Sequence, residues 1–312
     1  MASIVRYVAR PSARGLQAPC WVRTCDQAAA SASASSARCF ASQRRDDEKP
    51  SDILGSLRES WLSFRRVRDR FYHWYHQSTG TGFYRPEIDI CNCGVELGVK
   101  LPRPELLKRD ALVPGSREYL HQVYAGAMYW QIATRPRATE VPSDPDMLKG
   151  LDVLEVSCDR GGGAWYLTQV VKPKSYIAVD NDFYNLRFCH RHQPIDCLEF
   201  RDVDPLRLDE AFEANSFDWI LCVQAVTSYK DLDAFLRGVA HVLRPGGRLA
   251  LCDAFTRLQF QELKEGLERA DLEYVAQVDL TAKVTAAGFC YVPRKVAYMH
   301  YIVAKPETSD AE

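Results

Sequence analysis

The fold of this chain is decided by one stretch, Val153-Leu154-Glu155-Val156-Ser157-Cys158-Asp159-Arg160-Gly161-Gly162-Gly163. An apolar run leads into an acid and a short loop, and the glycines then open a helical segment that begins at Ala164. This order predicts a strand, a tight turn and a helix. The N-terminus of such a helix presents unpaired N–H groups and a partial positive charge, and glycines let a ligand approach the backbone. The stretch therefore predicts a nucleotide-type binding site.

Apolar runs and helical patterns alternate around this turn. Strands are expected at residues 152–157, 175–180, 197–201, 217–223, 248–252, 272–278 and 296–304. Helices are expected at residues 163–170, 183–190, 208–214, 231–243 and 258–270, with a short one from Thr281. Such alternation predicts an α/β fold with a doubly wound sheet of parallel strands. Ligand is expected at the carboxyl ends of the first and fourth strands, where strand order reverses.

A dinucleotide-binding fingerprint is one alternative for this loop. That fingerprint, G-x-G-x-x-G, requires glycine at two positions where this chain has Ser157 and Asp159. The match fails, and this disfavours a dinucleotide-dependent oxidoreductase.

The loop instead resembles motif I of class I S-adenosylmethionine (SAM)-dependent methyltransferases, acid-x-G-x-G-x-G. Glu155 matches the acid and Gly161 the third glycine, and LRPGGRL from Leu243 to Leu249 is similar to the family's turn before its fifth strand. The most similar branch methylates sterols, mycobacterial lipids and quinone-like rings, since its pattern E-V-G-C-G-x-G-G-G-A is met except at two glycines. The resemblance covers roughly residues 84–305. It implies a Rossmann-like sheet of seven mostly parallel strands with an antiparallel last strand, preceded by a helical N-terminal extension.

The resemblance also implies SAM as the cofactor. Glu155 would accept loop N–H bonds or receive the SAM ammonium, and Asp180 would bind the ribose hydroxyls. Asp204 lies in FRDVD, which is similar to F-x-x-G-D-A, and would accept the adenine amino group, while Gln224 would lie near the methionine end and the substrate. The implied cofactor-binding set is Glu155, Ser157, Asp159, Gly161, Asp180, Asn181, Asp204 and Gln224. No residue is marked out as a catalytic base, and no metal site is expected.

Two departures from motif I bear on activity. Ser157 is a small replacement for the first glycine, but Asp159 places a carboxylate where the ribose and amino acid of SAM are expected. Two like charges about 4 Å apart at an effective dielectric constant near 20 would cost about 4 kcal/mol. Alternatively, Asp159 contacts the SAM ammonium and the loop adapts.

Two functions follow. The first is SAM-dependent methyl transfer to a small apolar acceptor, such as a lipid or quinone, in mitochondria. The second is that of a catalytically inactive, methyltransferase-like subunit or assembly factor of a mitochondrial complex, which is motivated by Asp159 and by Val203 in place of the glycine of F-x-x-G-D-A.

Composition supports one sizeable domain with extensions. The chain has 312 residues, a formal net charge of −1 and 46% hydrophobic residues. A near-neutral charge gives no reason to expect nucleic acid as a partner. The 11 cysteines show no paired metal-binding spacing, so we interpret them as reduced thiols.

The N-terminal part differs from the rest. Residues 1–45 are rich in arginine, alanine and serine and poor in acids, which is typical of a mitochondrial transit peptide. Arg38-Cys39-Phe40 resembles a presequence cleavage site. We expect a helical cap and linker at residues 46–145, the SAM-binding domain at 146–305 and a disordered tail at 306–312. The predicted location is the mitochondrial matrix or the surface of the inner membrane.

Three helices are expected in the cap, of which the shortest spans Pro104 to Arg109. Residues 51–77 form a basic amphipathic pattern, which suits a membrane surface or packing on a protein. A further helix is expected from Ser116 to about Thr134, with His121, Tyr124 and Tyr129 either facing a substrate or serving as packing residues.

Overall fold

The computed structural model describes residues 89–98, 100–107, 112–135, 144–290, 292 and 294–307. The predicted transit peptide and the basic helix of residues 51–77 lie outside the described residues, as do residues 136–143 of the predicted linker and 308–312 of the predicted tail.

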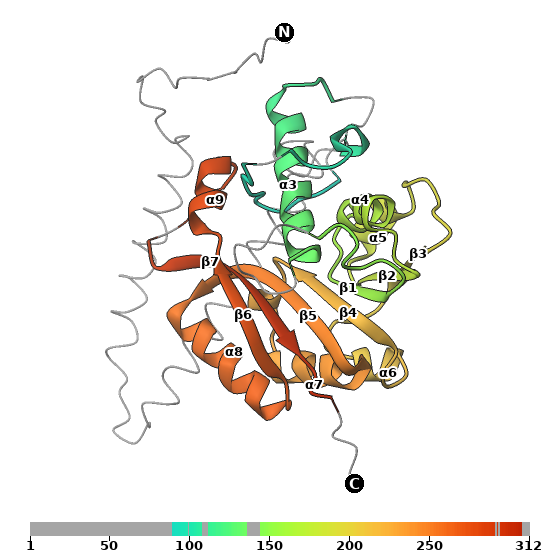
Figure 1. Cartoon of the computed structure of the whole chain (residues 1–312), viewed down its shortest axis with the longest axis vertical. Coiled ribbons are helices and arrows are strands. Elements are labelled where there is room, and N and C mark those ends of the chain that lie inside the picture. Colours follow the sequence, from blue (N-terminus) through green and yellow to red (C-terminus); the bar gives the residue numbers. More distant parts are fainter. Residues whose placement is uncertain are drawn as a thin grey trace, which may run out of the picture. The chain divides into compact units, whose positions relative to one another are not determined.

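A seven-stranded sheet lies at the centre of the described region, in the order β3-β2-β1-β4-β5-β7-β6 (Figure 1). The strands are β1 (Asp152–Val156), β2 (Ser175–Asp180), β3 (Leu198–Asp202), β4 (Phe217–Val223), β5 (Leu243–Thr256), β6 (Glu273–Asp279) and β7 (Val296–Ala304). Neighbours from β3 to β5 pair in parallel, and β7 pairs antiparallel with β5 and β6. The predicted doubly wound sheet and its antiparallel last strand are thus confirmed. Because strand order reverses between β1 and β4, their carboxyl ends flank a crevice of the kind that binds ligands in such sheets.

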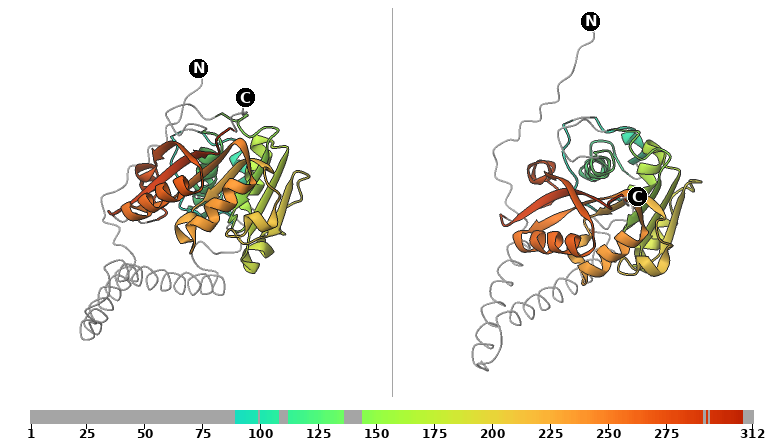
Figure 2. Two further views of the ribbon diagram at one scale, coloured as in Figure 1. Left: turned by 90° about the horizontal axis from the view of Figure 1, so that it is seen from below. Right: turned by 60° about the horizontal axis from the view of Figure 1, so that its bottom comes forward.

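Helices cover both faces of the sheet (Figure 2). One face packs against α3 (Arg117–Ala133), α4 (Gly162–Val171), α5 (Phe183–Cys189) and α9 (Thr281–Ala287). The other packs against α6 (Leu208–Ala211), α7 (Leu232–Val242) and α8 (Arg257–Arg269). Short 3-10 helices, η2 and η3, lie at Pro104–Leu107 and Val226–Ser228. Each layer has its own apolar core.

Strand β1 shows why the central strands are apolar throughout. Side chains alternate between the faces of a strand. Val153 accordingly joins the core beneath α3 and α4, while Leu154 and Val156 join the core beneath α7. A strand covered on both faces needs apolar residues at successive positions, and this is the pattern that precedes the glycine loop.

Most boundaries match the expected ones to within two residues, with two clear exceptions. The LRPGG stretch, expected as a turn before the fifth strand, lies within β5. There the N–H of Gly246 donates to the carbonyl of Lys305 at 2.9 Å, and the N–H of Lys305 donates to Gly247 at 3.0 Å. This pairing keeps the backbone extended around Gly246, whose φ of 76° lies in the left-handed range that favours glycine. The second exception is α6, which ends at Ala211 rather than Ala214.

Helix α3 joins the predicted cap to the sheet. Its start is capped by Ser116, whose hydroxyl accepts the N–H of Tyr119 at 3.2 Å. Met128 and Ile132 are fully buried in the core that lies between α4 and the face of the sheet covered by α3, α4, α5 and α9. The cap therefore contributes to the core that supports the glycine loop.

Candidate functional site

The loop after β1 has an unusual backbone. The φ angles of Ser157, Asp159 and Gly161 are 60°, 53° and 74°. These are the three glycine positions of the family pattern, and two of them hold the left-handed conformation with a side chain attached. Such residues cost of order 1–3 kcal/mol each and persist only where the surroundings impose them. The loop thus keeps the backbone of a glycine loop without two of its glycines.

Asp180, at the end of β2, holds this loop in place. Its Oδ2 accepts the N–H of Asp159 at 2.9 Å, and its Oδ1 accepts the N–H of Asp182 at 2.8 Å. The side chain is buried, and burial, together with the charge of Asp159, raises the pKa of Asp180 to about 7. A carboxylate offers about four lone-pair sites, so hydroxyl donors can still be accepted. The neighbouring Asn181 is exposed.

Glu155 has different hydrogen-bond partners from those expected. It is fully buried, and its two oxygens accept the hydroxyls of Tyr129 at 2.8 Å and Tyr176 at 2.5 Å. Burial raises its pKa to about 7, against the effect of both hydroxyls. The donors to Glu155 in the structure are thus two tyrosine hydroxyls, while the N–H of Asp159 in the loop donates to Asp180; the contact of Glu155 with the SAM ammonium stays a prediction. Since Tyr129 belongs to α3, Glu155 ties the cap to β1.

The three consecutive glycines pack against the protein itself. A Cβ added to each would lie 2.5 Å from the Phe200 ring at Gly161, 2.6 Å from the Asp89 carbonyl oxygen at Gly162 and 2.1 Å from the Tyr129 ring at Gly163. These glycines are required by close packing of β3, the 89–98 segment and α3. The partly exposed residues of the loop are Ser157 and Asp159, in its earlier part.

That earlier part retains accessible groups that fit SAM. Ser157 and Asp159 are partly exposed at the end of β1, Gln224 is partly exposed at the end of β4, and Asn181 is exposed after β2. Together with Asp180 they provide carboxylates for a cationic cofactor and its ribose, and loop N–H groups for its carboxylate. The residues at the carboxyl ends of β1, β2 and β4 are thus compatible with the implied cofactor.

Gln224 is brought to this site by its own strained backbone. Its φ is 56°, and its N–H donates to the carbonyl of Cys252 on β5 at 2.7 Å. Its side-chain oxygen accepts the N–H of Cys93 at 2.9 Å. The 89–98 segment therefore runs from Gly162 to the end of β4. No local signal in the sequence around Cys93 predicts this contact, which joins residues 131 positions apart.

Asp204 follows the carboxyl end of β3. The N–H of Val203 donates to the carbonyl of Asp180 at 3.1 Å, which places the end of β3 beside the end of β2. The Asp204 carboxylate accepts the N–H of Leu206 at 2.9 Å and so caps a turn. Its predicted contact with adenine stays a prediction.

The residues of α3 that had two interpretations serve in packing. His121 is buried, and its Nε2 lies 2.8 Å from the Asn92 carbonyl oxygen. Burial lowers the pKa of His121 to about 4, so the ring is neutral at physiological pH. Tyr129 donates to Glu155, and the Tyr124 ring contacts Phe289 at a centroid distance of 5.7 Å.

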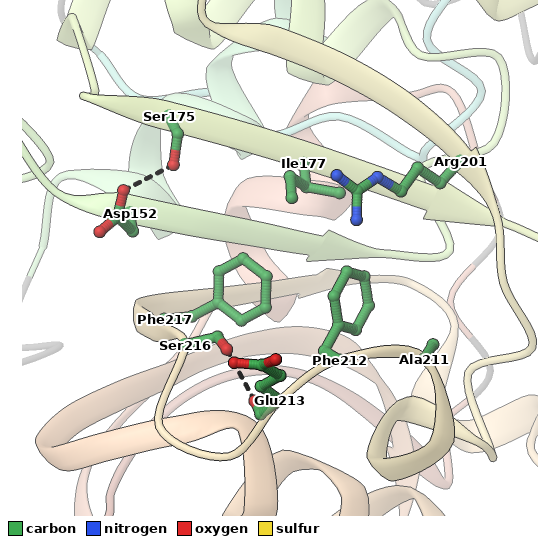
Figure 3. Close-up of a pocket in the computed structure, with 9 residues that line it drawn as sticks. All are labelled: Asp152, Ser175, Ile177, Arg201, Ala211, Phe212, Glu213, Ser216 and Phe217. Carbon is green, nitrogen blue, oxygen red and sulfur yellow. Dashed lines mark hydrogen bonds between the residues drawn. The ribbon is translucent and has the colours of Figure 1, made fainter.

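A separate cavity of about 400 Å³ lies near the amino ends of strands β1, β2 and β4 (Figure 3). Its lining includes Asp152, Ser175 and Phe217, which begin β1, β2 and β4. The Asp152 carboxylate is already engaged by Ser175 and by Lys174, and Arg201 on the rim pairs with an acid of its own strand. The cavity is distinct from the carboxyl-end site. Among the residues that the structure describes, no group of three or more His, Cys, Asp or Glu is placed to hold a metal ion.

Comparison with known proteins identifies the domain. Residues 154–251 match the model of a methyltransferase domain. A probable phthiotriol/phenolphthiotriol dimycocerosates methyltransferase 2 of Mycobacterium ulcerans is 38% identical over 137 residues, which are 44% of this chain and 52% of that protein. A fatty-acid O-methyltransferase of Mycolicibacterium smegmatis is 38% identical over 130 residues, 42% of this chain and 47% of that protein. The chain thus spans about half the length of these relatives.

Solved structures include a geranyl diphosphate methyltransferase in complex with SAM, with a TM-score of 0.49 and 15% identity over 68% of this chain and 97% of that one. The glycine loop, the acid at the end of β2 and the family match over residues 154–251 coincide in one domain. Residues 154–251 therefore match a methyltransferase domain, and the relatives that support this are lipid and fatty-acid methyltransferases of the class I SAM-dependent type.

Proposed function

We propose that this chain binds SAM at the carboxyl ends of β1, β2 and β4 and transfers its methyl group to a small apolar acceptor. The observation that carries the proposal is the cluster of left-handed residues there. Ser157, Asp159 and Gln224 all have side chains and φ between 53° and 60°. Strained backbone of this kind gathers at functional sites, where the strain aims donors at a ligand.

The charge of the site supports a cationic cofactor. The charge of Asp159 raises the pKa of both Asp180 and Glu155, and the charge of Asp180 adds to the rise at Glu155. SAM carries a sulfonium and an ammonium, and it supplies an activated methyl group when bound. The residues of the chain would then position donor and acceptor, an effect that can supply about 7–11 kcal/mol.

The acceptor class is proposed from the relatives. Their names specify phthiotriol derivatives and fatty acids, which are long apolar molecules with a polar acceptor group. We extend this to a lipid or quinone acceptor here. The Arg-rich composition of residues 1–45 supports a location in mitochondria, and the basic pattern of residues 51–77 supports contact with the membrane surface or with a protein complex. Among the described residues, no helix is long and apolar enough to cross a bilayer.

Calorimetric titration of the purified chain with SAM and with S-adenosylhomocysteine tests cofactor binding. We expect binding of both, and no heat at millimolar ligand would refute the proposal. Transfer is tested with methyl-labelled SAM and a total mitochondrial lipid extract, in which labelled lipid is the expected product. Label that appears only in added protein would refute the acceptor class.

The alternative is a non-catalytic subunit or assembly factor of a mitochondrial complex. It is favoured by the Asp159 carboxylate, which contacts the Cys91 side chain of the segment that covers the loop. An absence of SAM binding combined with comigration of the chain with a respiratory or ribosomal complex on a native gel would support this function. SAM binding by the free chain would argue against it.

A further inference from the structure

Two cysteines from distant parts of the chain meet at one tyrosine. The Sγ atom of Cys93 lies 3.0 Å from the Tyr298 hydroxyl oxygen, and the Sγ atom of Cys290 lies 3.6 Å from the same oxygen. The two thiols also lie within hydrogen-bonding reach of each other. Cys93 belongs to the segment that covers the ends of the strands, Cys290 to the connection between α9 and β7, and Tyr298 to β7.

The environment distinguishes the two thiols. The contact with Cys290, followed by contacts with Tyr298 and Gln224, lowers the pKa of Cys93 to about 7 against the effects of burial and of the Asp253 charge. The same contact and burial raise the pKa of Cys290. These contacts favour the thiolate on Cys93 over the thiolate on Cys290. A thiolate is the form that attacks peroxides and disulfides.

We propose that Cys93 and Cys290 are a redox modification site that hydrogen peroxide converts to an intramolecular disulfide. The Cys93 thiolate attacks one peroxide oxygen, so that an S–O bond forms, the O–O bond breaks and hydroxide leaves. The Cys290 sulfur then attacks the sulfenic sulfur of Cys93, forming the S–S bond and releasing hydroxide, which takes up the proton of the thiol as water. Each cysteine is oxidised by one electron, and the peroxide is reduced to one molecule of water and one hydroxide, which takes a proton from the solvent.

The disulfide would fix the cover over the candidate site. The N–H of Cys93 donates to Gln224, and Asn92 donates to the carbonyl of Ala125 on α3. A covalent bond from Cys93 to Cys290 would add a tie between this segment and the C-terminal part of the sheet. The 89–98 segment would then no longer be able to move away from the end of β4.

The chain contains a matched control pair. Cys158 and Cys189 are also within hydrogen-bonding reach of each other, and their Sγ atoms lie 3.9 Å and 3.4 Å from the Asp159 carbonyl oxygen. Both are buried, with 1% exposure each, whereas Cys93 and Cys290 are partly exposed. Burial raises the pKa of Cys158. We expect this pair to resist peroxide because both sulfurs are buried and burial disfavours the Cys158 thiolate.

The test uses the full chain, treated with a small molar excess of hydrogen peroxide at pH 7.5 and then alkylated. Peptide mass spectrometry without reduction should show a Cys93–Cys290 crosslink that dithiothreitol reverses, with Cys158 and Cys189 alkylated only after unfolding. In Cys290→Ser, a dimedone probe should label Cys93 as the sulfenic acid, and Cys93→Ser should abolish the crosslink. Tyr298→Phe should slow its formation several-fold.

Three results would overturn the proposal. They are an alkylated, uncrosslinked Cys93 after peroxide treatment, a crosslink at Cys158–Cys189 formed at the same rate, and a Cys93 that the dimedone probe does not label in Cys290→Ser. These outcomes do not depend on SAM, so the proposal can fail or hold independently of the proposed function.

Discussion

Replacing Glu155 with glutamine should change how the stability of this protein depends on pH. Glu155 is fully buried between two tyrosine hydroxyls, and burial raises its pKa from 4.5 to about 7. A folded-state pKa above the unfolded value means that the native state binds the extra proton. Protonation of Glu155 therefore stabilises the native state. Its contribution to the free energy of unfolding is complete below pH 4.5 and is lost as the pH rises through 7. A shift of this size corresponds to about 3 kcal/mol, since each pKa unit is worth about 1.4 kcal/mol.

Glutamine keeps the shape of the side chain without a titrating group. Its oxygen can accept one tyrosine hydroxyl, and its amide can donate to the oxygen of the other. We expect Glu155→Gln to gain up to about 3 kcal/mol relative to the wild type between pH 5 and pH 8. The remaining slope belongs to Asp180, whose pKa is also raised to about 7 by burial.

The assay is urea unfolding followed by fluorescence at pH 5.0, 6.5 and 8.0, with the free energy of unfolding obtained by linear extrapolation. Glu273→Gln is the matched control, because Glu273 is an exposed glutamate on β6 and its replacement should leave the pH dependence unchanged. An identical pH dependence in wild type and Glu155→Gln would show that Glu155 is not protonated in the native state, and our account of its environment would fail.

Three further predictions concern the loop and its supports. Asp159→Gly distinguishes the two roles of Asp159. A gain of tenfold or more in SAM affinity in calorimetry is expected if the variant removes repulsion between the Asp159 and SAM carboxylates, since each 1.4 kcal/mol is worth a factor of ten, whereas lost affinity would show that Asp159 contacts the SAM ammonium. Ser157→Gly is the control, with an expected change of less than threefold. Gly163→Ala should lower the free energy of unfolding by about 1–3 kcal/mol, since its Cβ would lie 2.1 Å from the Tyr129 ring, and unchanged urea denaturation would contradict this packing. SAM affinity should rise between pH 6 and pH 8, because Asp180, whose pKa is raised to about 7, becomes ionised in that range; an affinity that falls with pH would exclude its carboxylate as the partner of a cation.

The architecture could be predicted because its signals are local and repeated. The apolar run before Ser157 marks a strand covered on both faces, and the buried positions Phe235, Leu236 and Val239 mark one face of α7. The acid at the end of β2 was also placed correctly, since parallel strands bring their carboxyl ends to one edge. Each of these features depends on a few neighbouring residues and on rules that hold for all sheets of this kind.

The partners of the site residues could not be predicted in the same way. Glu155 occupies the expected position, but its hydroxyl donors come from α3 and from β2, and the choice of Tyr129 depends on how the cap packs. The contact between Cys93 and Gln224 likewise joins residues 131 positions apart. Such contacts depend on side-chain packing between elements, which periodicity does not encode.

The amino-acid order alone determined a doubly wound sheet with a glycine loop at its switch point, because strand and helix periods and turn residues act over short distances. Only the tertiary structure decided that Gly163 receives a tyrosine ring and that Asp180 holds the N–H of Asp159. It also brought Cys93, Cys290 and Tyr298 together. The physical reason is that hydrogen bonds and close packing act over a few ångströms, so they depend on which distant segments the folded chain brings into contact.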